Sequence, residues 1–440
     1  MLMLRPRPDS FHPPSTEHNT GSSSGFWVSS RSNNGAPLRR RQFIELGAGF
    51  ALTALAAPSA RARAKDRILI AGGGILGAAM AYHLSRRGAQ VTLLEKTRPA
   101  AGATGKSFAW INATFSKQPR HYHLLNRLGV HAWRSLQDEI GAELPTRFGG
   151  TVEWYSNPAR AEELRRMSRL QQEWGYAVRL IEGEEFSRLE STVNPGKPLV
   201  TAFSELEGSV DAGQAARVLL GRAEKAGAKI VYPCEVMGIE ASPESAVLAK
   251  TSQGEFRGDI LVLACGVGTP KLAALAGARV PLTPSPGLVV RTTPQASLVQ
   301  RVLVTEDSHF RQQADGRLVL GDDFDPPHTE IHKLLESQPQ DFPNPSFAEL
   351  HGRRIRAQAA RYLPAVASAP IESVSICWRP LPQDGFPVVG PASGNSPVYL
   401  AVTHSGVTLG PLLGELIAME LLDGVHVDLL EPYRPARFND

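Results

Sequence analysis

Three closely spaced glycines have the pattern that phosphate binding requires. Gly72, Gly74 and Gly77 form G-x-G-x-x-G between a short β-branched run at 67–71 and a helical pattern at 78–87. The first glycine permits a tight turn, the second lets the backbone approach a pyrophosphate, and the third lets helix and strand pack closely. The N-terminus of the helix adds partial positive charge. The sequence therefore predicts a dinucleotide bound through its pyrophosphate, against the alternative of a glycine-rich structural turn.

Glu95 narrows the choice of nucleotide. It closes a second predicted strand at 90–95 and lies 23 residues after Gly72. A carboxylate in this place accepts hydrogen bonds from ribose hydroxyls and repels the 2′-phosphate of NADP. FAD and NAD both remain, because the glycine pattern does not distinguish between them.

Three further glycine-rich segments favour FAD over NAD. The loop at 96–113 is longer than a simple NAD-type connection needs, and its small residues can wrap a second phosphate and approach a flat ring. A predicted strand at 260–264 opens into more glycines, and another at 398–402 leads through His404-Ser405-Gly406 into a helix at about 409–422. We expect the N-terminus of that helix to face an anion or an electron-rich ring edge.

Composition and charge exclude several classes of protein. The chain has 440 residues, enough for two domains, and 42% of them are apolar. The formal net charge of +4 comes mostly from residues 1–64, which hold eight arginines against three acidic residues, so nucleic-acid binding is not indicated. Three cysteines lie far apart, without the spacing of a zinc site or a disulfide framework, and we expect no metal site. No apolar run reaches the ~18 residues of a transmembrane helix.

Residues 1–64 have the features of a leader rather than of a folded domain. Residues 1–38 are rich in Ser, Pro, Asn and Gly without periodicity, which is typical of disorder. Arg39–Arg41 precede an apolar run at 46–57, and small-x-small cleavage sites follow at 60–64. The stretch RRQFI resembles the R-R-x-F-[LI] pattern of a twin-arginine export signal. We expect export to the periplasm; the alternative is an uncleaved disordered tail on a cytoplasmic protein.

Six segments, in order along the chain, resemble one enzyme family. From Arg67 to about Gly424 the chain is similar to the FAD-dependent D-amino-acid oxidase/dehydrogenase superfamily, which includes glycine oxidase, sarcosine oxidase and bacterial D-amino-acid dehydrogenases. The resemblance implies an α/β fold: a discontinuous, Rossmann-like FAD-binding domain of the GR2 type, and an α+β substrate domain whose antiparallel sheet covers the flavin ring. The matching segments are the glycine motif, 102–110, 208–230, 261–272, 314–321 and 378–391.

The same resemblance divides the chain into domains. After the leader at 1–64, we expect the FAD-binding domain to comprise 65–150, 206–284 and 377–440. The substrate domain then comprises 151–205 and 285–376, and the turn at Asp315-Gly316 fits a hairpin in its sheet.

The resemblance implies oxidation of the C–N bond of a small amino acid, with a D-amino acid as the first expectation. Hydride passes to flavin N5, water hydrolyses the imine, and oxygen or a quinone of the respiratory chain reoxidises the flavin. Peripheral membrane association and the oligomeric state stay open. The alternatives are a sarcosine/pipecolate-type oxidase of N-substituted amino acids with covalent flavin, a non-catalytic FAD-binding electron-transfer subunit, and an NAD-dependent dehydrogenase.

Arg379 is the first candidate for substrate binding. It lies in a W-R-P motif, where the resemblance implies an arginine that pairs with the substrate carboxylate, a task that suits the planar guanidinium group. The alternative is a structural salt bridge. Tyr122, His123, Trp378 and His404 are further candidates for the substrate pocket.

Cys377 raises the question of a covalent flavin. In the sarcosine and pipecolate branch of the family, a cysteine two residues before the position of Arg379 carries the flavin. That branch has an aromatic residue where this chain has Arg379, so a small buried thiol is the other interpretation of Cys377.

The remaining candidates are residues expected to contact FAD. By the glycine motif and by resemblance they are Gly72, Gly74, Ile75, Leu76, Gly77, Glu95, Lys96, Gly102, Thr104, Gly105, Ser107, Val236, Ala264, Gly266, Gly406, Val407 and Thr408.

Overall fold

The structure, a computed structural model, describes residues 67–438 apart from 116, 243–244, 323–344 and 395. The predicted leader at 1–64 therefore lies outside the described residues. Among the helices that are described, none combines the length and the apolar character needed to cross a bilayer.

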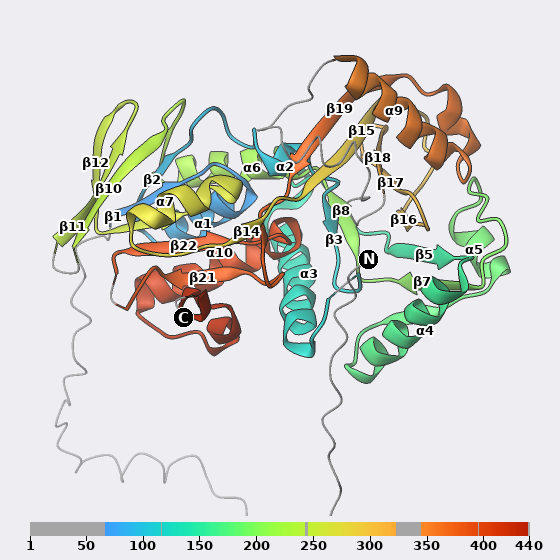
Figure 1. Cartoon of the computed structure of the whole chain (residues 1–440), viewed down its shortest axis with the longest axis horizontal. Coiled ribbons are helices and arrows are strands. Elements are labelled where there is room, and N and C mark those ends of the chain that lie inside the picture. The colour runs from blue at the N-terminus through green and yellow to red at the C-terminus, as the bar shows by residue number, and fades with distance from the viewer. Residues whose placement is uncertain (1–66, 116, 243–244, 323–344, 395, 439–440) are drawn as a thin grey trace, which may run out of the picture. The chain divides into compact units, whose positions relative to one another are not determined.

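A six-stranded sheet carries the glycine motif (Figure 1). In the order in which they lie side by side, its strands are β21 (Val388–Pro391), β22 (Val398–Val402), β13 (Ile260–Leu263), β1 (Arg67–Ala71), β2 (Gln90–Leu94) and β9 (Lys229–Val231). These six strands pair in parallel, except that β21 runs antiparallel to β22. The four strands predicted here are confirmed to within one residue, and the mostly parallel sheet confirms the Rossmann-like fold.

The side chains of β1 are buried on both faces of this sheet. Ile68 and Ile70 belong to one hydrophobic core, while Leu69 and Ala71 belong to the core on the opposite face. Neighbouring residues of a strand point to opposite faces, so a strand covered on both sides has a continuous apolar sequence. This explains why the run at 67–71 shows no alternation.

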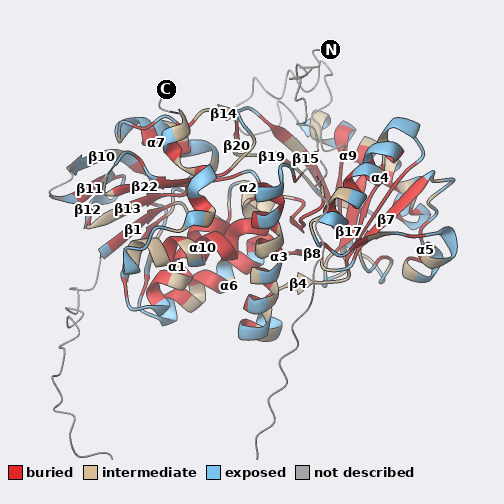
Figure 2. Cartoon of the chain, turned by 90° about the horizontal axis from the view of Figure 1, so that it is seen from below, coloured by how far each residue is buried: buried red, intermediate tan, exposed pale blue. Residues whose placement is uncertain are grey.

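Helices cover one face of the sheet, where α1 packs against α6 and α10, and α10 packs against α3. Half of the residues of α10 are buried (Figure 2). The predicted helices at 78–87 and 409–422 begin three residues earlier than expected, because the residues at 75–77 and 406–408 already have helical backbone. These helices are α1 (Ile75–Arg86), α3 (Arg120–Ile140), α6 (Ala212–Lys225) and α10 (Gly406–Asp423).

A short helix and a small antiparallel sheet pack on the other face, where they share a hydrophobic core with β1, β13 and β22. They are α7 (Thr269–Leu275), β10 (Val236–Ser242), β11 (Ser245–Thr251) and β12 (Gly254–Gly258).

A second, eight-stranded sheet confirms the expected antiparallel sheet with one addition: β16 pairs with β5 in parallel. In order, the strands are β19 (Ile371–Trp378), β15 (Pro286–Pro294), β18 (Arg317–Gly321), β17 (His309–Gln312), β16 (Val302–Val304), β5 (Thr151–Tyr155), β7 (Val200–Ser204) and β6 (Val178–Leu180). The predicted hairpin is present, since β17 and β18 pair antiparallel on either side of Asp315-Gly316.

Helices pack on this second sheet as well, with α4 against β5, β6 and β7, and α9 against β15, β18 and β19. Their bounds, with that of the short α5, are α4 (Pro158–Glu173), α5 (Gly183–Leu189) and α9 (Pro345–Ala360). The other face of the sheet carries Val289, Val304 and Val319, which pack with Phe108 and Trp110 from the loop after β2. That loop therefore lies between the two large sheets.

Short elements complete the connections between the sheets. A three-stranded antiparallel sheet joins the loop after β2 to the segment before α6, and a two-stranded one joins 282–283 to 381–382. These elements are β3 (Trp110–Ile111), β8 (Gly208–Val210), β4 (Thr146–Arg147), β14 (Leu282–Thr283), β20 (Leu381–Pro382) and the one-turn α2 (Ala103–Lys106). The domain bounds stay a prediction. The expected boundary between residues 376 and 377 falls within β19, which runs from Ile371 to Trp378.

Candidate active site

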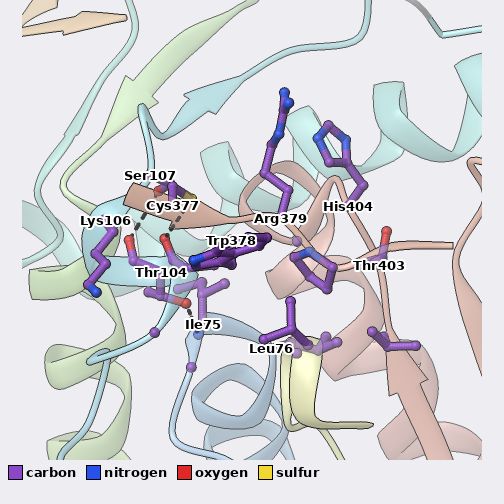
Figure 3. A pocket seen from close by; sticks show the side chains of 18 of the residues that line it. Ile75, Leu76, Thr104, Lys106, Ser107, Cys377, Trp378, Arg379, Thr403 and His404 are labelled. Atoms are coloured by element: carbon purple, nitrogen blue, oxygen red, sulfur yellow. Dashed lines mark hydrogen bonds between the residues drawn. The ribbon is translucent and has the colours of Figure 1, made fainter. Parts of the chain in front are cut away.

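A cavity of about 840 Å³ extends from the glycine motif to the ends of β19 and β22. Figure 3 shows part of its lining, with Ile75 and Leu76 of α1 on one side and Arg379 and His404 on the other. Ligand pockets commonly have volumes of ~300–1,000 Å³, so this cavity has the size of a cofactor or substrate site.

Most of the predicted site residues line this cavity. Among the residues expected to contact FAD, Gly77 and Gly105 are the exceptions, since they pack behind the lining. Among the substrate candidates, Tyr122, Trp378, His404 and Arg379 line the cavity and His123 does not.

The glycine turn brings the backbone of β1 and α1 to the cavity surface. Gly72 has φ +110°, a conformation that glycine adopts easily, and its amide donates to the Leu94 carbonyl oxygen at 2.9 Å. The amide of Ile75, in the first turn of α1, donates to Thr104 Oγ1 at 3.0 Å. The loop after β2 is therefore fixed to the N-terminus of α1, where anions bind well.

Glu95 lies at the cavity wall with its carboxylate already oriented. Its Oε2 accepts from the Gly73 amide at 2.7 Å, and its Oε1 accepts from the Thr97 amide at 2.9 Å. An ionised carboxylate has about four acceptor positions, so both oxygens can still accept from ribose hydroxyls.

The N-terminus of α10 presents backbone N–H groups to the same cavity. Gly406, Val407 and Thr408 line it, and the first amides of a helix have no partner within the helix. The Thr408 side chain holds this helix end against the loop after β2, because its Oγ1 accepts from the Asn112 amide at 3.1 Å and donates to the Trp110 carbonyl oxygen at 3.3 Å. The helix end can therefore face a ring edge or an anion without moving.

Arg379 and His404 lie side by side in the lining (Figure 3). Arg379 is held at its base, since both its amide and its Nε donate to the Ser285 carbonyl oxygen, at 3.0 and 3.3 Å. The His404 side chain is accessible from the cavity, but the protein around the cavity desolvates it. This desolvation, with the charges of Lys117 and Arg379, lowers the pKa of His404 to about 3. The imidazole is therefore neutral at ordinary pH.

Cys377 lines the cavity as a protonated thiol. Its side chain is buried and its Sγ donates to the Ala103 carbonyl oxygen at 3.6 Å. Burial raises its pKa to about 11, although the charges of Arg379, Arg291 and Lys106 act in the opposite direction. Since the thiolate is the nucleophilic form of cysteine, this environment does not activate it.

Tyr122 and His123 are neighbours on α3 with different surroundings. The Tyr122 hydroxyl forms a hydrogen bond with Ser405 Oγ at 2.8 Å. His123 is buried beneath the loop after β2, where its Nδ1 donates to the Ala113 carbonyl oxygen at 2.8 Å and its ring contacts Tyr176. Its role is thus to support the wall of the cavity from behind.

A buried carboxylate shapes the loop that contributes this wall. Glu207 is fully buried, and it accepts hydrogen bonds from the Trp110 indole at 3.2 Å and from the amides of Ala113 and Thr114 at 2.8 and 2.9 Å. The loop is therefore positioned by an acid from the segment between β7 and β8. Nothing in the local sequence of Glu207 indicates this contact, which joins residues about 95 positions apart.

Several lining residues were not among the sequence candidates. Lys117 and Ser405 lie beside Tyr122, and Asn112 lies near the start of α10. The available signal was weak: Ser405 belongs to the glycine turn at 404–406, and Lys117 is the one charged residue of the stretch 112–119. His309 and Asp322, at the ends of the β17–β18 hairpin, also line the cavity.

Two buried polar atoms of the lining have no hydrogen-bond partner among the described residues. They are Asn112 Oδ1 and Trp378 Nε1, an acceptor and a donor. Buried polar atoms are rarely left unpaired, so both indicate a polar ligand that completes the site. With the glycine turn, Glu95 and the start of α10 along one cavity, the residues fit FAD: its pyrophosphate, its ribose and its flavin each find suitable groups.

The comparisons with known proteins agree with this geometry. A model of the FAD dependent oxidoreductase (DAO) family matches residues 67–419, so the chain belongs to this family. Proteins of this family are described as FAD-dependent oxidoreductases, and FAD is the cofactor that this cavity fits.

Individual relatives show the extent of the similarity. The chain is 25% identical over 368 residues to 4-methylaminobutanoate oxidase (formaldehyde-forming) of Paenarthrobacter nicotinovorans, covering 81% of this chain but 44% of that protein. It therefore spans less than half the length of this relative. Glycine oxidase of Bacillus licheniformis is 26% identical, with 84% of this chain and 97% of that protein covered. The crystal structure of glycine oxidase from Geobacillus kaustophilus has a TM-score of 0.74 at 22% identity, covering 84% of this chain and 99% of that chain, which shows a shared fold.

Proposed function

We propose that the protein oxidises the C–N bond of a small amino acid, with a D-amino acid as the first candidate. The observation that carries this proposal is Arg379, which lies in the cavity lining beside the neutral imidazole of His404. A guanidinium group binds a carboxylate through paired hydrogen bonds and so orients the rest of an amino acid. The resemblance to D-amino-acid oxidases and dehydrogenases supports the D configuration.

The cofactor's part follows from its chemistry. When bound, FAD would supply the acceptor for the hydride of the substrate carbon, and water would then hydrolyse the imine to a carbonyl compound and an amine or ammonia. The chain's own residues bind and orient. The glycine turn and the start of α1 would hold the pyrophosphate, Glu95 would accept from ribose hydroxyls, and the amides at the start of α10 would donate to the flavin.

At the substrate end, Arg379 fixes the carboxylate while His404 faces the same space. Because the His404 imidazole is neutral, its unprotonated ring nitrogen can accept a hydrogen bond from the substrate amino group. A charged imidazole would repel a substrate ammonium. Positioning of this kind is the main contribution that a protein makes to hydride transfer.

An N-substituted amino acid is the second candidate. The similarity to 4-methylaminobutanoate oxidase favours it, because that name describes the oxidation of a methylated amine. The covalent flavin of the sarcosine and pipecolate branch is less well supported, since burial holds the Cys377 thiol in its protonated form. We therefore propose FAD bound without a covalent link for either substrate.

Export remains part of the proposal. We propose that the arginine pair at 40–41 directs the folded holoprotein to the periplasm, where oxygen or a quinone accepts the electrons. Replacing both arginines with lysine should leave the protein in the cytoplasmic fraction of its host. Periplasmic recovery of that variant would contradict a twin-arginine route.

The experiment that tests the reaction is a screen under anaerobic conditions. Purified holoprotein is mixed with matched D- and L-amino acids and with their N-methyl derivatives, and the loss of the visible absorbance of oxidised flavin is followed. Faster bleaching by D-amino acids supports the first candidate, and faster bleaching by N-methyl amino acids supports the second. Absence of bleaching by every amine would instead indicate a non-catalytic electron-transfer subunit.

A further inference from the structure

A buried lysine lines the cavity without an acidic partner. Lys117 is 7% exposed, and its Nζ donates to Ser405 Oγ at 2.8 Å. The Nζ also lies 5.4 Å from the centroid of the Tyr122 ring. No ion pair joins Lys117 to a carboxylate among the described residues. An ammonium group has three N–H donors, and a buried charge is costly unless it is paired, so this lysine is suited to a further, anionic partner.

The acidic residues of the same cavity are engaged elsewhere. Glu95 accepts from the backbone of the glycine turn, Glu235 pairs with Lys96 at 3.2 Å, and Asp322 pairs with Arg354. None of these three residues forms an ion pair with Lys117. Among the described residues that line the cavity, no carboxylate therefore pairs with Lys117.

Lys117 lies at the N-terminus of a helix, where a cation is disfavoured. Its hydrogen-bond acceptor Ser405 is the N-cap residue of α10. Helix N-termini carry partial positive charge, and cations are normally favoured at the opposite end. A lysine fixed at a helix N-terminus is unfavourable on its own, and an anion beside its Nζ stabilises it.

Lys117 and Arg379 line the same cavity. The charge of each reaches the His404 imidazole, which stands beside Arg379 in Figure 3. Under the proposed function, Arg379 binds one substrate carboxylate. Lys117 is a second cation of the same lining, and a second anionic group of the substrate can pair with it.

We propose that Lys117 binds a second anionic group of the substrate, so that the preferred substrate is an amine that carries two carboxylates. The inference rests on the proposed function, because Arg379 holds the first carboxylate. The second carboxylate lies on the side chain or on the nitrogen of the amino acid, and both arrangements share the chemistry that Lys117 recognises.

Binding of acids that cannot be oxidised tests this inference. Succinate and butyrate have chains of equal length and differ by one carboxylate. We expect the wild-type holoprotein to bind succinate about tenfold or more tightly than butyrate, as a buried charge-assisted hydrogen bond implies. Dissociation constants come from titration calorimetry or from changes in the flavin spectrum. Equal affinity for the two acids would overturn the inference without any variant.

Variants of Lys117 assign the preference to this side chain. Lys117→Met removes the charge at nearly constant length, and we expect it to lose the preference for succinate while it still binds butyrate. Lys117→Arg keeps a charge and should retain most of the preference, which a loss of packing alone would not reproduce. Lys271→Met is the control, because Lys271 is an exposed lysine of the same cavity, and its preference should equal that of the wild type.

The remaining outcomes are also decisive. If Lys117→Met keeps the preference for succinate, or shifts only the reduction potential of the flavin, the lysine serves the cofactor and the inference is wrong. If Lys117→Met does not load FAD, the preference for succinate over butyrate in the wild type and in Lys117→Arg decides whether the inference holds. Failure of the proposed function can be told apart from failure of this inference, because the acids test binding and amines test flavin reduction. Selective binding of succinate without bleaching by any amine would reject the proposed function and leave the inference about Lys117 standing.

Discussion

Gly77 packs so closely against the turn before it that a Cβ atom on Gly77 would lie 2.0 Å from the carbonyl oxygen of Gly72. That oxygen is a backbone atom, and the Gly72 amide donates a hydrogen bond to the Leu94 carbonyl oxygen of β2. The turn therefore cannot easily shift to make room for a side chain. We expect Gly77→Ala to push α1 away from β1 and to lose FAD. The measurement is the ratio of flavin to protein after purification.

Gly221→Ala is the matched control for this substitution. Gly221 lies within α6, and a Cβ there would meet nothing within 4 Å. Alanine is a better helix former than glycine, so the variant should keep its FAD and gain up to about 1 kcal/mol in the free energy of unfolding. Full flavin content in Gly77→Ala would show that close packing at this turn is not required.

Arg379→Met should weaken the binding of carboxylate substrates and leave the cofactor in place. Loss of a paired, charge-assisted hydrogen bond raises KM by about 10- to 100-fold. Arg379→Lys should fall between the wild type and Arg379→Met, since lysine keeps the charge but not the planar fork. Steady-state kinetics and flavin content measured on the same preparations check this, and an unchanged KM in Arg379→Met would remove Arg379 from the substrate site.

Cys377 should carry no flavin. Burial raises the pKa of this thiol to about 11, so almost no thiolate exists at neutral pH. After acid precipitation we expect the FAD in the supernatant, and Cys377→Ala should contain as much flavin as the wild type. Flavin fluorescence that stays in the washed pellet of the wild type, and not in that of Cys377→Ala, would establish the covalent alternative.

Glu153 should make the protein less stable as pH rises. It is buried and hydrogen-bonded to Tyr155, and burial, with the nearby Glu207, raises its pKa from 4.5 to about 7. Between pH 4.5 and about 7, the Glu153 carboxyl is deprotonated in the unfolded state and still protonated in the folded state. The free energy of unfolding therefore falls as pH rises through this range, by up to about 3 kcal/mol.

Glu153→Gln removes this dependence. The variant should show a flatter pH profile between about 4.5 and 7, and it should exceed the wild type in the free energy of unfolding at pH 8. Chemical denaturation across this range measures the effect. Glu224→Gln replaces an exposed glutamate of α6 and serves as the control. If Glu153→Gln keeps the wild-type slope, another group titrates in this window.

Local patterns were sufficient to predict much of the fold. Residues adjacent in the sequence encode the strands β1, β13 and β22, the glycines that follow them, and the turn between β17 and β18. The predicted bounds of these elements were therefore correct to within about one residue. Helix starts were placed late, because a glycine motif does not reveal where helical backbone begins.

The arrangement of the site depends on contacts between distant residues. Lys117 meets Ser405 across 288 positions, and Asn112 meets Thr408 across 296, so neither contact has a local signal. Tyr122 and His123 seemed equivalent in sequence, yet successive residues of a helix point in different directions. Only the packing of α3 decides that Tyr122 reaches the cavity and that His123 supports the loop.

A single anaerobic turnover tests the central claim most directly. The holoprotein is mixed with amino acids of each class, including amines with two carboxylates, and both the flavin spectrum and the products are recorded. We expect at least one of them to bleach the flavin and to yield an equimolar carbonyl compound. A flavin that stays oxidised with every amino acid and amine would contradict the assignment of this cavity to amine oxidation.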